Sequence, residues 1–245
     1  DMLVMPVEVR WQLEQAGGGP LLIAVARDIT DRRMAEQRLK HLASYDSLTG
    51  LPNRTLFHET LHDTIETARE KDARVAVLTI GLDRFKIVND SLGAALGDEL
   101  LRQFSNRLVE CLHTRDTVGR LADEFALILT VRDQEDAVHV ASEVREALRA
   151  PFDLDGHHPQ LTASIGIAMY PDDATDPQTL IKYADTAMGR AKAAGRDGYR
   201  FFTAGMNVQV LARLDLEVAL RRALENGEFE LYYQPKMNVN TGRIT

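Results

Sequence analysis

Two adjacent acidic residues, Asp123 and Glu124, lie between two apolar runs that are rich in β-prone side chains. This pattern predicts a β-hairpin over 118–130 that carries the two carboxylates at its tip. Paired carboxylates at a strand turn are suitable ligands for Mg²⁺, which prefers oxygen donors and shares its coordination shell with the phosphates of a substrate. An ordinary hairpin with a solvated acidic turn has the same local pattern, so the interpretation depends on the rest of the chain.

The composition, with 44% hydrophobic and 27% charged residues in 245, is that of a globular protein. A formal net charge of −8 argues against a general nucleic-acid or anionic-membrane surface. Cys111 is the only cysteine, which excludes a disulfide framework, and its apolar helical context predicts a buried thiol. The longest clean apolar run, 21–26, is far shorter than the ~20 residues of a membrane-spanning helix. We therefore expect a cytoplasmic setting, no nucleic-acid binding, and no membrane contact within this segment.

Hydrophobic periodicity predicts helices and strands through the middle of the chain. The run from Arg74 to Ile80 is almost continuously apolar, as in a central strand that is covered on both faces. Besides the hairpin, we predict helices at 54–69, 83–89, 98–113, 133–149 and 177–194, a loop at 93–97, and strands at 74–80, 160–169 and 199–202. This order favours an α/β sandwich with a mainly antiparallel central sheet.

Both ends of the chain carry elements that are too few to form domains by themselves. Residues 1–29 predict two strands, which look like the tail of a larger sheet because two strands alone are not stable. A helix over 30–45 follows, either as a solvated linker or as a parallel two-stranded coiled segment that passes a signal between domains. Further on we predict a helix at 207–225 and strands at 229–234 and 237–244. Because the first residue is not Met, we expect the chain to be a segment of a longer protein.

Six short motifs are spread over the middle of the chain. They are Asp46-x-Leu-Thr-Gly-Leu-x-Asn-Arg54, Phe85-Lys-x-x-Asn-Asp90, Gly97-Asp98, Arg120-Leu-Ala-Asp-Glu-Phe125, Ser164-x-Gly-x-Ala168 and Ala191-Lys-x-x-Gly-Arg196. In order and spacing they resemble the GGDEF-family diguanylate cyclases, which implies a nucleotide-cyclase-like α/β sandwich.

Two further segments resemble other signalling domains. The segment Asp28-Ile-Thr-Asp-Arg-Arg33 resembles the end of a PAS sensor domain, and Glu230-Leu-Tyr-Tyr-Gln-Pro235 resembles the opening strand of an EAL-family cyclic di-GMP phosphodiesterase. The resemblance implies a PAS–GGDEF–EAL parent protein. Its parts here would be PAS strands at 1–29, a linker helix at 30–45, a GGDEF domain at 46–204, and a linker helix with the first EAL strands at 205–245.

The resemblance implies a reaction between two GTP molecules. Two GGDEF domains would face one another, each holding one GTP, and each 3′-hydroxyl would attack the partner's α-phosphate to give cyclic di-GMP. In phosphoryl-type transfer, metal ions neutralise the developing charge, and positioning supplies most of the remaining catalysis. The implied partners are GTP, cyclic di-GMP and a second copy held through the PAS part and linker helix, and the implied cofactor is Mg²⁺.

The resemblance also implies roles for individual residues. Asn89 and Asp98 match the pair that reads guanine, although helix capping is an alternative role for each. The other implied GTP-binding residues are Phe85, Lys86, Lys192 and Arg196. The implied metal ligands are the backbone of Leu82 and the carboxylates of Asp123 and Glu124, which are also the catalytic positions.

The first departure from the family concerns the metal site. The family's strand ends in Asp-x-Asp, and the first Asp is a principal metal ligand, whereas this chain has Gly81-Leu82-Asp83. Gly81 supplies no side chain, and Asp83 has the predicted role of capping the following helix. Loss of one metal carboxylate would cost ~4 kcal/mol of transition-state stabilisation, or roughly a thousandfold in rate.

Two further departures lie at the hairpin and just before it. One residue is absent at the tip, and Ala122 occupies a glycine position. Because a one-residue slip reverses the face to which a side chain points, Asp123 and Glu124 would no longer converge on the metals. The family's inhibitory Arg-x-x-Asp motif falls on His113 and Asp116, where imidazole replaces guanidinium poorly.

These departures predict a degenerate, catalytically inactive GGDEF domain that binds GTP and regulates an attached EAL phosphodiesterase. Two alternatives stay open. One is an active cyclase whose metal site is rebuilt from Asp83 and the shifted acidic pair. The other is a purely structural dimerisation module without nucleotide binding.

Overall fold

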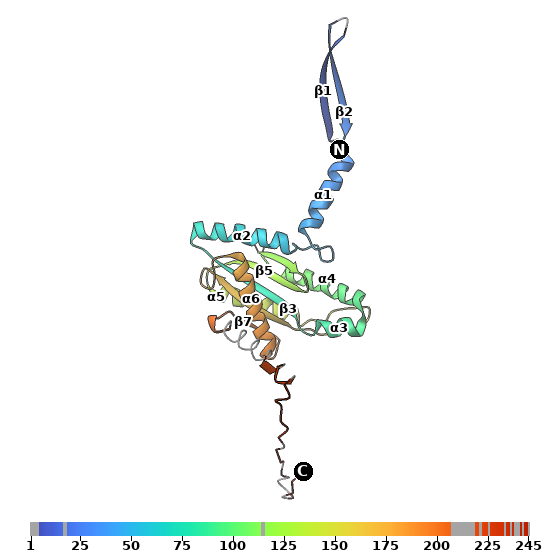
Figure 1. Ribbon diagram of the computed structural model, residues 1–245. Helices are drawn as coiled ribbons and strands as arrows, with labels where there is room; N and C mark the ends of the chain where they lie inside the picture. Colours follow the sequence, from blue (N-terminus) through green and yellow to red (C-terminus); the bar gives the residue numbers. More distant parts are fainter. Residues whose placement is uncertain are drawn as a thin grey trace. The chain divides into compact units, whose positions relative to one another are not determined.

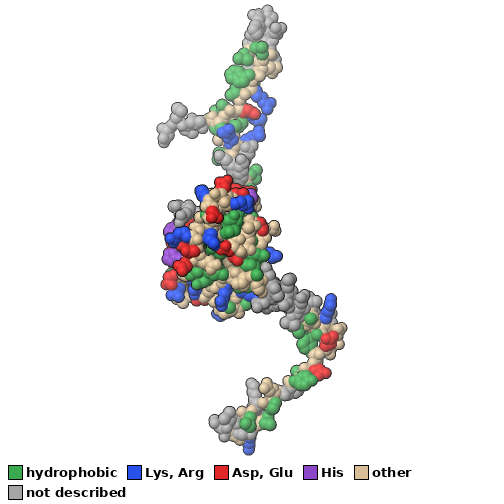
Figure 2. Space-filling view, turned by 90° about the vertical axis from the view of Figure 1, so that its left-hand side faces the viewer, with side chains coloured by type: hydrophobic (Ala, Val, Ile, Leu, Met, Phe, Trp, Pro, Cys, Tyr) green, Lys and Arg blue, Asp and Glu red, His purple; other side chains and the backbone are tan. Residues whose placement is uncertain are grey.

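The computed structural model describes residues 5–16, 19–113 and 116–206, and then 219–220, 222–224, 226–232, 234–235, 237, 241 and 243–244. The chain divides into two compact units, residues 1–202 and 203–245, and the candidate site lies in the first (Figure 1). On the face drawn in Figure 2, acidic, basic and apolar side chains are interspersed over the sheet-containing part of the first unit. No helix in the described part of the chain combines the length and the apolar composition that crossing a membrane requires.

A five-stranded sheet forms the centre of the first unit, in the order β4-β5-β3-β6-β7 (Figure 1). Its strands are β3 (Arg74–Leu82), β4 (Thr117–Leu121), β5 (Glu124–Val131), β6 (Ala163–Tyr170) and β7 (Gly198–Phe201). Only the β6–β7 pair is parallel, and the other three pairs are antiparallel. The mainly antiparallel sheet, the hairpin and the central position of β3 are thus as predicted from the sequence.

Helices cover both faces of this sheet. They are α2 (Arg54–Lys71), α3 (Phe85–Leu92), α4 (Ala94–Glu110), α5 (Gln134–Ala147) and α6 (Pro177–Ala193). Side chains alternate along β3, so Leu78 and Ile80 join the core formed with α4 and α5, where Phe104 meets Phe125 edge to face at 4.8 Å. The opposite face packs against α6, which contacts β3, β6 and β7.

Capping side chains set the starts of three of these helices. The Asn53 side chain accepts hydrogen bonds from two backbone N–H groups at the start of α2, and Asp133 does the same for α5. Asp176 caps α6, and Pro177 follows as its first residue, where a missing N–H costs nothing. Caps of this kind are worth ~1 kcal/mol each.

The α3–α4 pair differs from its predicted boundaries. Helix α3 begins at Phe85 because Arg84 lies before it in a left-handed conformation, with φ of 61°. Helix α4 begins at Ala94 rather than at 98, so the predicted loop shrinks to Gly93, whose φ of 86° and ψ of 162° suit only glycine. Both Asn89 and Asp98 therefore lie inside helices, and the alternative that they cap helices is wrong.

The elements that precede the sheet are β1 (Val7–Ala16), β2 (Gly19–Asp28) and α1 (Thr30–Ser44). The two strands pair antiparallel along their whole length. The Asp28 carboxylate accepts hydrogen bonds from the backbone N–H and the hydroxyl of Thr30, which starts the helix.

The second unit departs from the predicted strands. Most of the predicted helix at 207–225 lies outside the described residues, of which 219–220 and 222–224 are helical. The described residues of 229–234 form no strand, and the predicted strand at 237–244 reduces to one antiparallel bridge between Met237 and Ile244. A strand needs a hydrogen-bonded neighbour along its length, and the described residues of this unit supply only that bridge.

Candidate functional site

The hairpin tip separates the two acidic side chains. Leu121 pairs with Glu124, so the turn consists of Ala122 and Asp123 alone. Phe125 pairs with Ile80 of β3, which makes Glu124 the neighbour of Gly81 in the same register. Directly opposed residues project from the same face of a sheet, so Glu124 points towards α6 while Asp123 is exposed in the turn.

The backbone at Ala122 is strained. Its φ of 70° lies in the left-handed region, where a Cβ atom collides with the following carbonyl oxygen. We predict that Ala122→Gly raises the free energy of unfolding by about 0.5–1 kcal/mol, because glycine adopts this conformation without strain. Urea denaturation measures the change, and Ala193→Gly, at the exposed end of α6, should change stability in the opposite direction. A loss of stability in Ala122→Gly would contradict the strained turn.

Lys192 fills the space that the missing side chain leaves at Gly81. A Cβ atom at position 81 would lie 2.5 Å from Lys192 Nζ and 2.7 Å from Cε, which is closer than non-bonded atoms approach. The ammonium nitrogen also lies 3.3 Å from Glu124 Oε1, and each of these two side chains is 35% exposed. A lysine ammonium thus occupies the corner between Gly81 and Glu124.

Asp185 is a second carboxylate at this corner that the sequence patterns did not single out. It precedes Lys192 by seven residues on α6, and this spacing puts both side chains on one face of the helix. The spacing could therefore have indicated from the sequence that Asp185 lies near Lys192. Although the residue as a whole is exposed, burial of its carboxyl group, followed by the charge of Glu124, raises its pKa to about 6. Arg54 and Lys192 oppose this rise by their positive charge.

The raised pKa of Asp185 makes stability depend on pH. The folded state keeps a proton that the unfolded state releases between pH values of about 4 and 6, so the protein loses stability as pH rises through this window. We predict that Asp185→Asn raises the free energy of unfolding by about 1 kcal/mol at pH 7.5, allowing for solvent screening, and by much less at pH 4. Urea titrations at the two pH values test this. The control is Asp63→Asn, at an exposed position of α2. Equal effects at both pH values would show that Asp185 titrates normally.

Asp83 has a structural role that corrects the sequence prediction. Its side chain is 3% exposed and accepts hydrogen bonds from Thr162 Oγ1 at 2.7 Å, Ser164 Oγ at 2.7 Å and the backbone N–H of Asp197 at 3.1 Å. The predicted capping of α3 is therefore wrong, because three donors from β6 and its surroundings satisfy the carboxylate instead. These bonds use both carboxylate oxygens of Asp83, which weakens the idea of a metal site rebuilt around it.

A polar pocket of about 300 Å³ opens beside Asp83 at the end of β3. It is lined by Asp83, Arg84, Gln160, Leu161, Thr162, Gly195, Arg196 and Asp197. Arg145 of α5 holds the turn that carries Arg196, because its guanidinium donates to both the carboxylate and the carbonyl oxygen of Asp197. The sequence patterns did not predict Arg84 as a residue of the candidate site, although its position directly after Asp83 could have indicated it.

The guanine-matching residues lie together where α3 meets α4. A Cβ atom at Gly97 would lie 1.7 Å from Asn89 Oδ1, so only glycine allows the amide to lie against the start of α4. Asn89 Oδ1 is buried and has no hydrogen-bond partner among the described residues. Asp98, next to Gly97, is exposed. A buried, unpaired acceptor costs ~1–3 kcal/mol and is a common mark of a ligand site.

The remaining residues that matched the family are spread between the Gly81 corner and the Asn89–Asp98 site. Phe85 packs partly buried against the core, Leu82 is buried and Lys86 is exposed on the first turn of α3. Cys111 is half-buried rather than buried, because it lies at the end of α4 instead of within it, and this burial raises the pKa of its thiol.

His113 and Asp116 line a separate pocket of about 260 Å³. The backbone N–H of His113 donates to Asp116 Oδ2 at 3.0 Å. Arg132 also lines this pocket and supplies a guanidinium that the motif lacks, but Asp136 holds it through two side-chain hydrogen bonds.

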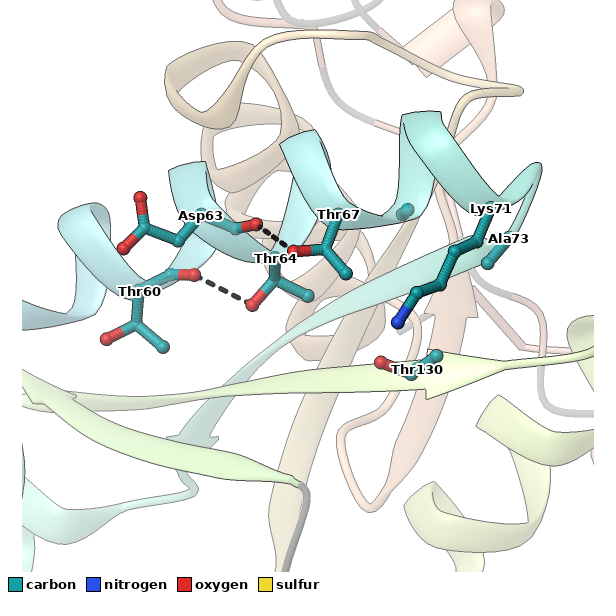
Figure 3. Close-up of a pocket in the computed structure, with 8 residues that line it drawn as sticks. Thr60, Asp63, Thr64, Thr67, Lys71, Ala73 and Thr130 are labelled. Carbon is teal, nitrogen blue, oxygen red and sulfur yellow. Dashed lines mark hydrogen bonds between the residues drawn. The ribbon is translucent and has the colours of Figure 1, made fainter.

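A larger cavity of about 380 Å³ lies between α2 and β5, away from the Gly81 corner and from Asn89 and Asp98 (Figure 3). One wall is a row of threonines along α2, with Lys71 at the end of the same helix, and Thr130 of β5 lies opposite. The hydroxyls of Thr64 and Thr67 donate to carbonyl oxygens of their own helix at 2.7 and 2.9 Å. These two hydroxyl protons are already used within the helix, so Asp63 and Lys71 are the charged residues that the cavity offers.

The residues at the Gly81 corner do not fit a pair of Mg²⁺ ions. Magnesium needs several oxygen ligands in octahedral geometry. Gly81 supplies none, Glu124 is paired with Lys192, and Asp123 lies apart in the turn. In the described part of the chain, no group of three or more His, Cys, Asp or Glu side chains is placed to hold a metal ion.

The family model described as "Diguanylate cyclase, GGDEF domain" matches residues 43–198, well over half of the chain. This chain belongs to the GGDEF family. A solved structure of the GGDEF domain of TpbB (YfiN) from Pseudomonas aeruginosa superposes with a TM-score of 0.67 and 38% identity, and covers 68% of this chain and 99% of that one. The cyclase-like fold implied by the sequence motifs is therefore confirmed.

Two curated GGDEF relatives indicate the biological setting. The bifunctional diguanylate cyclase/cyclic di-GMP phosphodiesterase MucR of P. aeruginosa is 40% identical over 214 residues, which are 87% of this chain and 31% of MucR. The cyclic di-GMP phosphodiesterase PdeR of Escherichia coli is 38% identical over 217 residues, which are 88% of this chain and 32% of PdeR. The chain thus spans about a third of each relative, and this GGDEF domain belongs to cyclic di-GMP signalling.

Two of the GGDEF motifs have physical roles in this fold. Arg120, at the start of the hairpin motif, donates to Asp46 Oδ1 at 2.9 Å and so joins the motif that precedes α2 to the hairpin. In the motif at 164–168, Ser164 binds Asp83, and Gly166 lets α6 approach the sheet. These residues build the frame around the site rather than its chemistry.

Proposed function

We propose that this GGDEF domain binds GTP without converting it to cyclic di-GMP and regulates a phosphodiesterase within a longer protein. The observation that carries the proposal is the buried, unpaired amide oxygen of Asn89, held against Gly97 and beside Asp98. Guanine presents one hydrogen-bond donor at N1 and two at N2. The Asp98 carboxylate accepts from N1–H and one N2–H, and the unpaired Asn89 Oδ1 accepts from the second N2–H while its NH₂ group donates to the acceptor N3. This combination selects guanine over adenine.

The absence of turnover is the second part of the proposal. The missing ligand at Gly81, the pairing of Glu124 with Lys192 and the outward position of Asp123 all support it. Each removes or occupies a carboxylate that would otherwise stabilise charge on the phosphates during transfer. The three losses act on one step, so we expect no cyclic di-GMP from this domain.

We also propose how the domain sits in its parent protein. Residues 1–29 end a PAS domain, 30–45 form a linker helix, 46–204 are the GGDEF domain, and 205–245 lead into an EAL domain. The length of the two curated relatives, about three times that of this chain, supports a larger parent. Exposed Met34, Leu39 and Leu42 on α1 support a homodimer through the linker helix. A cytoplasmic location, with GTP and cyclic di-GMP as the ligands of the parent, follows from this proposal.

The test measures binding and turnover on one preparation. Isothermal titration should show GTP binding at least about tenfold tighter than ATP, and chromatography after incubation should show no cyclic di-GMP. Gly97→Ala should weaken GTP binding because its methyl group displaces the Asn89 amide, whereas Gly205→Ala, which fills open space, should not. Clear production of cyclic di-GMP would favour an active cyclase. Absence of GTP binding would favour a purely structural module.

A further inference from the structure

We propose that the ammonium group of Lys192 is the resident cation of the phosphate site, so that this domain binds GTP without a divalent metal ion. The inference rests on the proposed binding of GTP and concerns how the phosphates are held. Its basis is the corner between Gly81 and Glu124, which Lys192 Nζ occupies.

The space for this ammonium exists because residue 81 has no side chain. A Cβ atom there would lie 2.5 Å from Lys192 Nζ and 2.9 Å from Met188 Sδ, so any larger residue would push the end of Lys192 aside. The strand end, the α6 face and Glu124 therefore enclose a position that suits one small cation. Replacement of a carboxylate by glycine thus does more than delete a ligand, since it admits a positive charge in the same place.

The ion pair between Lys192 and Glu124 also disfavours a divalent ion. Glu124 lies 3.3 Å from the ammonium, and its negative charge contributes to the raised pKa of Asp185. An ion that entered would have to break the Lys192–Glu124 pair and would then face an ammonium. Lysine carries three N–H donors on a compact charge, and in the described part of the chain one of them is directed to Glu124.

Two further cations lie near the end of β3. Arg84 and Arg196 line the pocket that begins at Asp83, two residues beyond Gly81. Arg145 fixes the turn that carries Arg196 by its hydrogen bonds to Asp197. The two guanidinium groups, which bind phosphate oxygens in a forked geometry, share this pocket with the carboxylates of Asp83 and Asp197, and the Lys192 ammonium adds a third positive charge at the Gly81 corner.

The first test compares GTP binding by the full chain in excess Mg²⁺ and in excess EDTA. We expect dissociation constants within about threefold of each other. A loss of at least about tenfold in EDTA would overturn the inference while leaving the proposed GTP binding intact. Absence of binding in both buffers would overturn the proposed function and, with it, the metal-free phosphate site.

A second test needs no nucleotide and uses Mn²⁺ as the probe, followed by electron paramagnetic resonance. Wild-type protein and Gly81→Asn should leave the Mn²⁺ spectrum unchanged, whereas Gly81→Asp should bind the ion because it sets a second carboxylate beside Glu124. Wild-type binding as tight as that of Gly81→Asp would overturn the inference. Thermal melts check that each variant is folded. The Mn²⁺ measurement on wild-type protein tests the inference even if a variant does not fold.

Variants at Lys192 complete the test. Lys192→Met keeps the length of the side chain but removes its charge, and should weaken GTP binding in EDTA at least about tenfold. Lys192→Arg should restore part of the affinity because it returns a positive charge to the same corner. Equal GTP binding by wild type and Lys192→Met in EDTA would show that Lys192 has no part in holding the phosphates.

Discussion

Replacement of Gly166 by alanine is expected to lower the free energy of unfolding by about 4 kcal/mol, or to prevent folding altogether. A Cβ atom at this position would lie 1.9 Å from the carbonyl oxygen of Ala184 and 2.2 Å from the backbone nitrogen of Met188. These are backbone atoms of α6, which cannot rotate away, so the helix would have to leave β6. Because α6 also carries Lys192 and Asp185, the same displacement would disturb the candidate site.

Urea denaturation followed by circular dichroism measures this effect, and Gly189→Ala is the matched control. Gly189 lies within the same helix, and a Cβ atom there meets nothing within 4 Å. That substitution should stabilise the protein by about 0.5–1 kcal/mol through helix propensity alone. A cost below about 1 kcal/mol for Gly166→Ala would show that the helix and strand do not approach so closely.

The second large effect is expected for Asp83→Ala, at about 3 kcal/mol of unfolding free energy. The buried carboxylate accepts hydrogen bonds from Thr162, Ser164 and the backbone N–H of Asp197. Removing it leaves three donors without their partner in a site from which water is largely excluded. Asp83→Asn keeps one acceptor oxygen and should cost less, since the two hydroxyls can also accept from its amide.

Asp90→Ala, at an exposed position of α3, is the control for Asp83→Ala and should have a small effect. The double variant Thr162→Val with Ser164→Ala removes two of the three donors and should lower the cost of a further Asp83→Ala substitution. If Asp83 instead served a metal, Asp83→Ala would change Mn²⁺ binding and leave stability nearly unchanged. That outcome would revive the active-cyclase alternative.

The local patterns of the sequence were sufficient for the order of elements and the family. The apolar run from Arg74 to Ile80 predicted a central strand, and the structure places β3 there. The apolar flanks of the acidic tip predicted the hairpin that β4 and β5 form. Burial of one or both faces of a strand fixes how apolar residues repeat along it. These features can therefore be recognised without knowing which elements the strand packs against.

The boundaries and the second unit were less well predicted because they depend on single residues or on partners. One glycine, Gly93, replaces the predicted loop, since only its conformation allows two helices to meet so abruptly. The predicted strand at 229–234 is absent from the described residues there, because alternation alone does not supply the neighbour that a strand requires.

The sequence by itself determined the GGDEF fold and pointed to Gly81 and Ala122 as the positions where we expect a departure from the family. Only the tertiary structure decided what surrounds these two positions. Asp83 finds donors 79 to 114 residues away, and Lys192 reaches across from α6 to fill the space beside Gly81. Contacts of this range leave no local pattern, because they arise from packing a helix and three strands together rather than from the periodicity of any one segment.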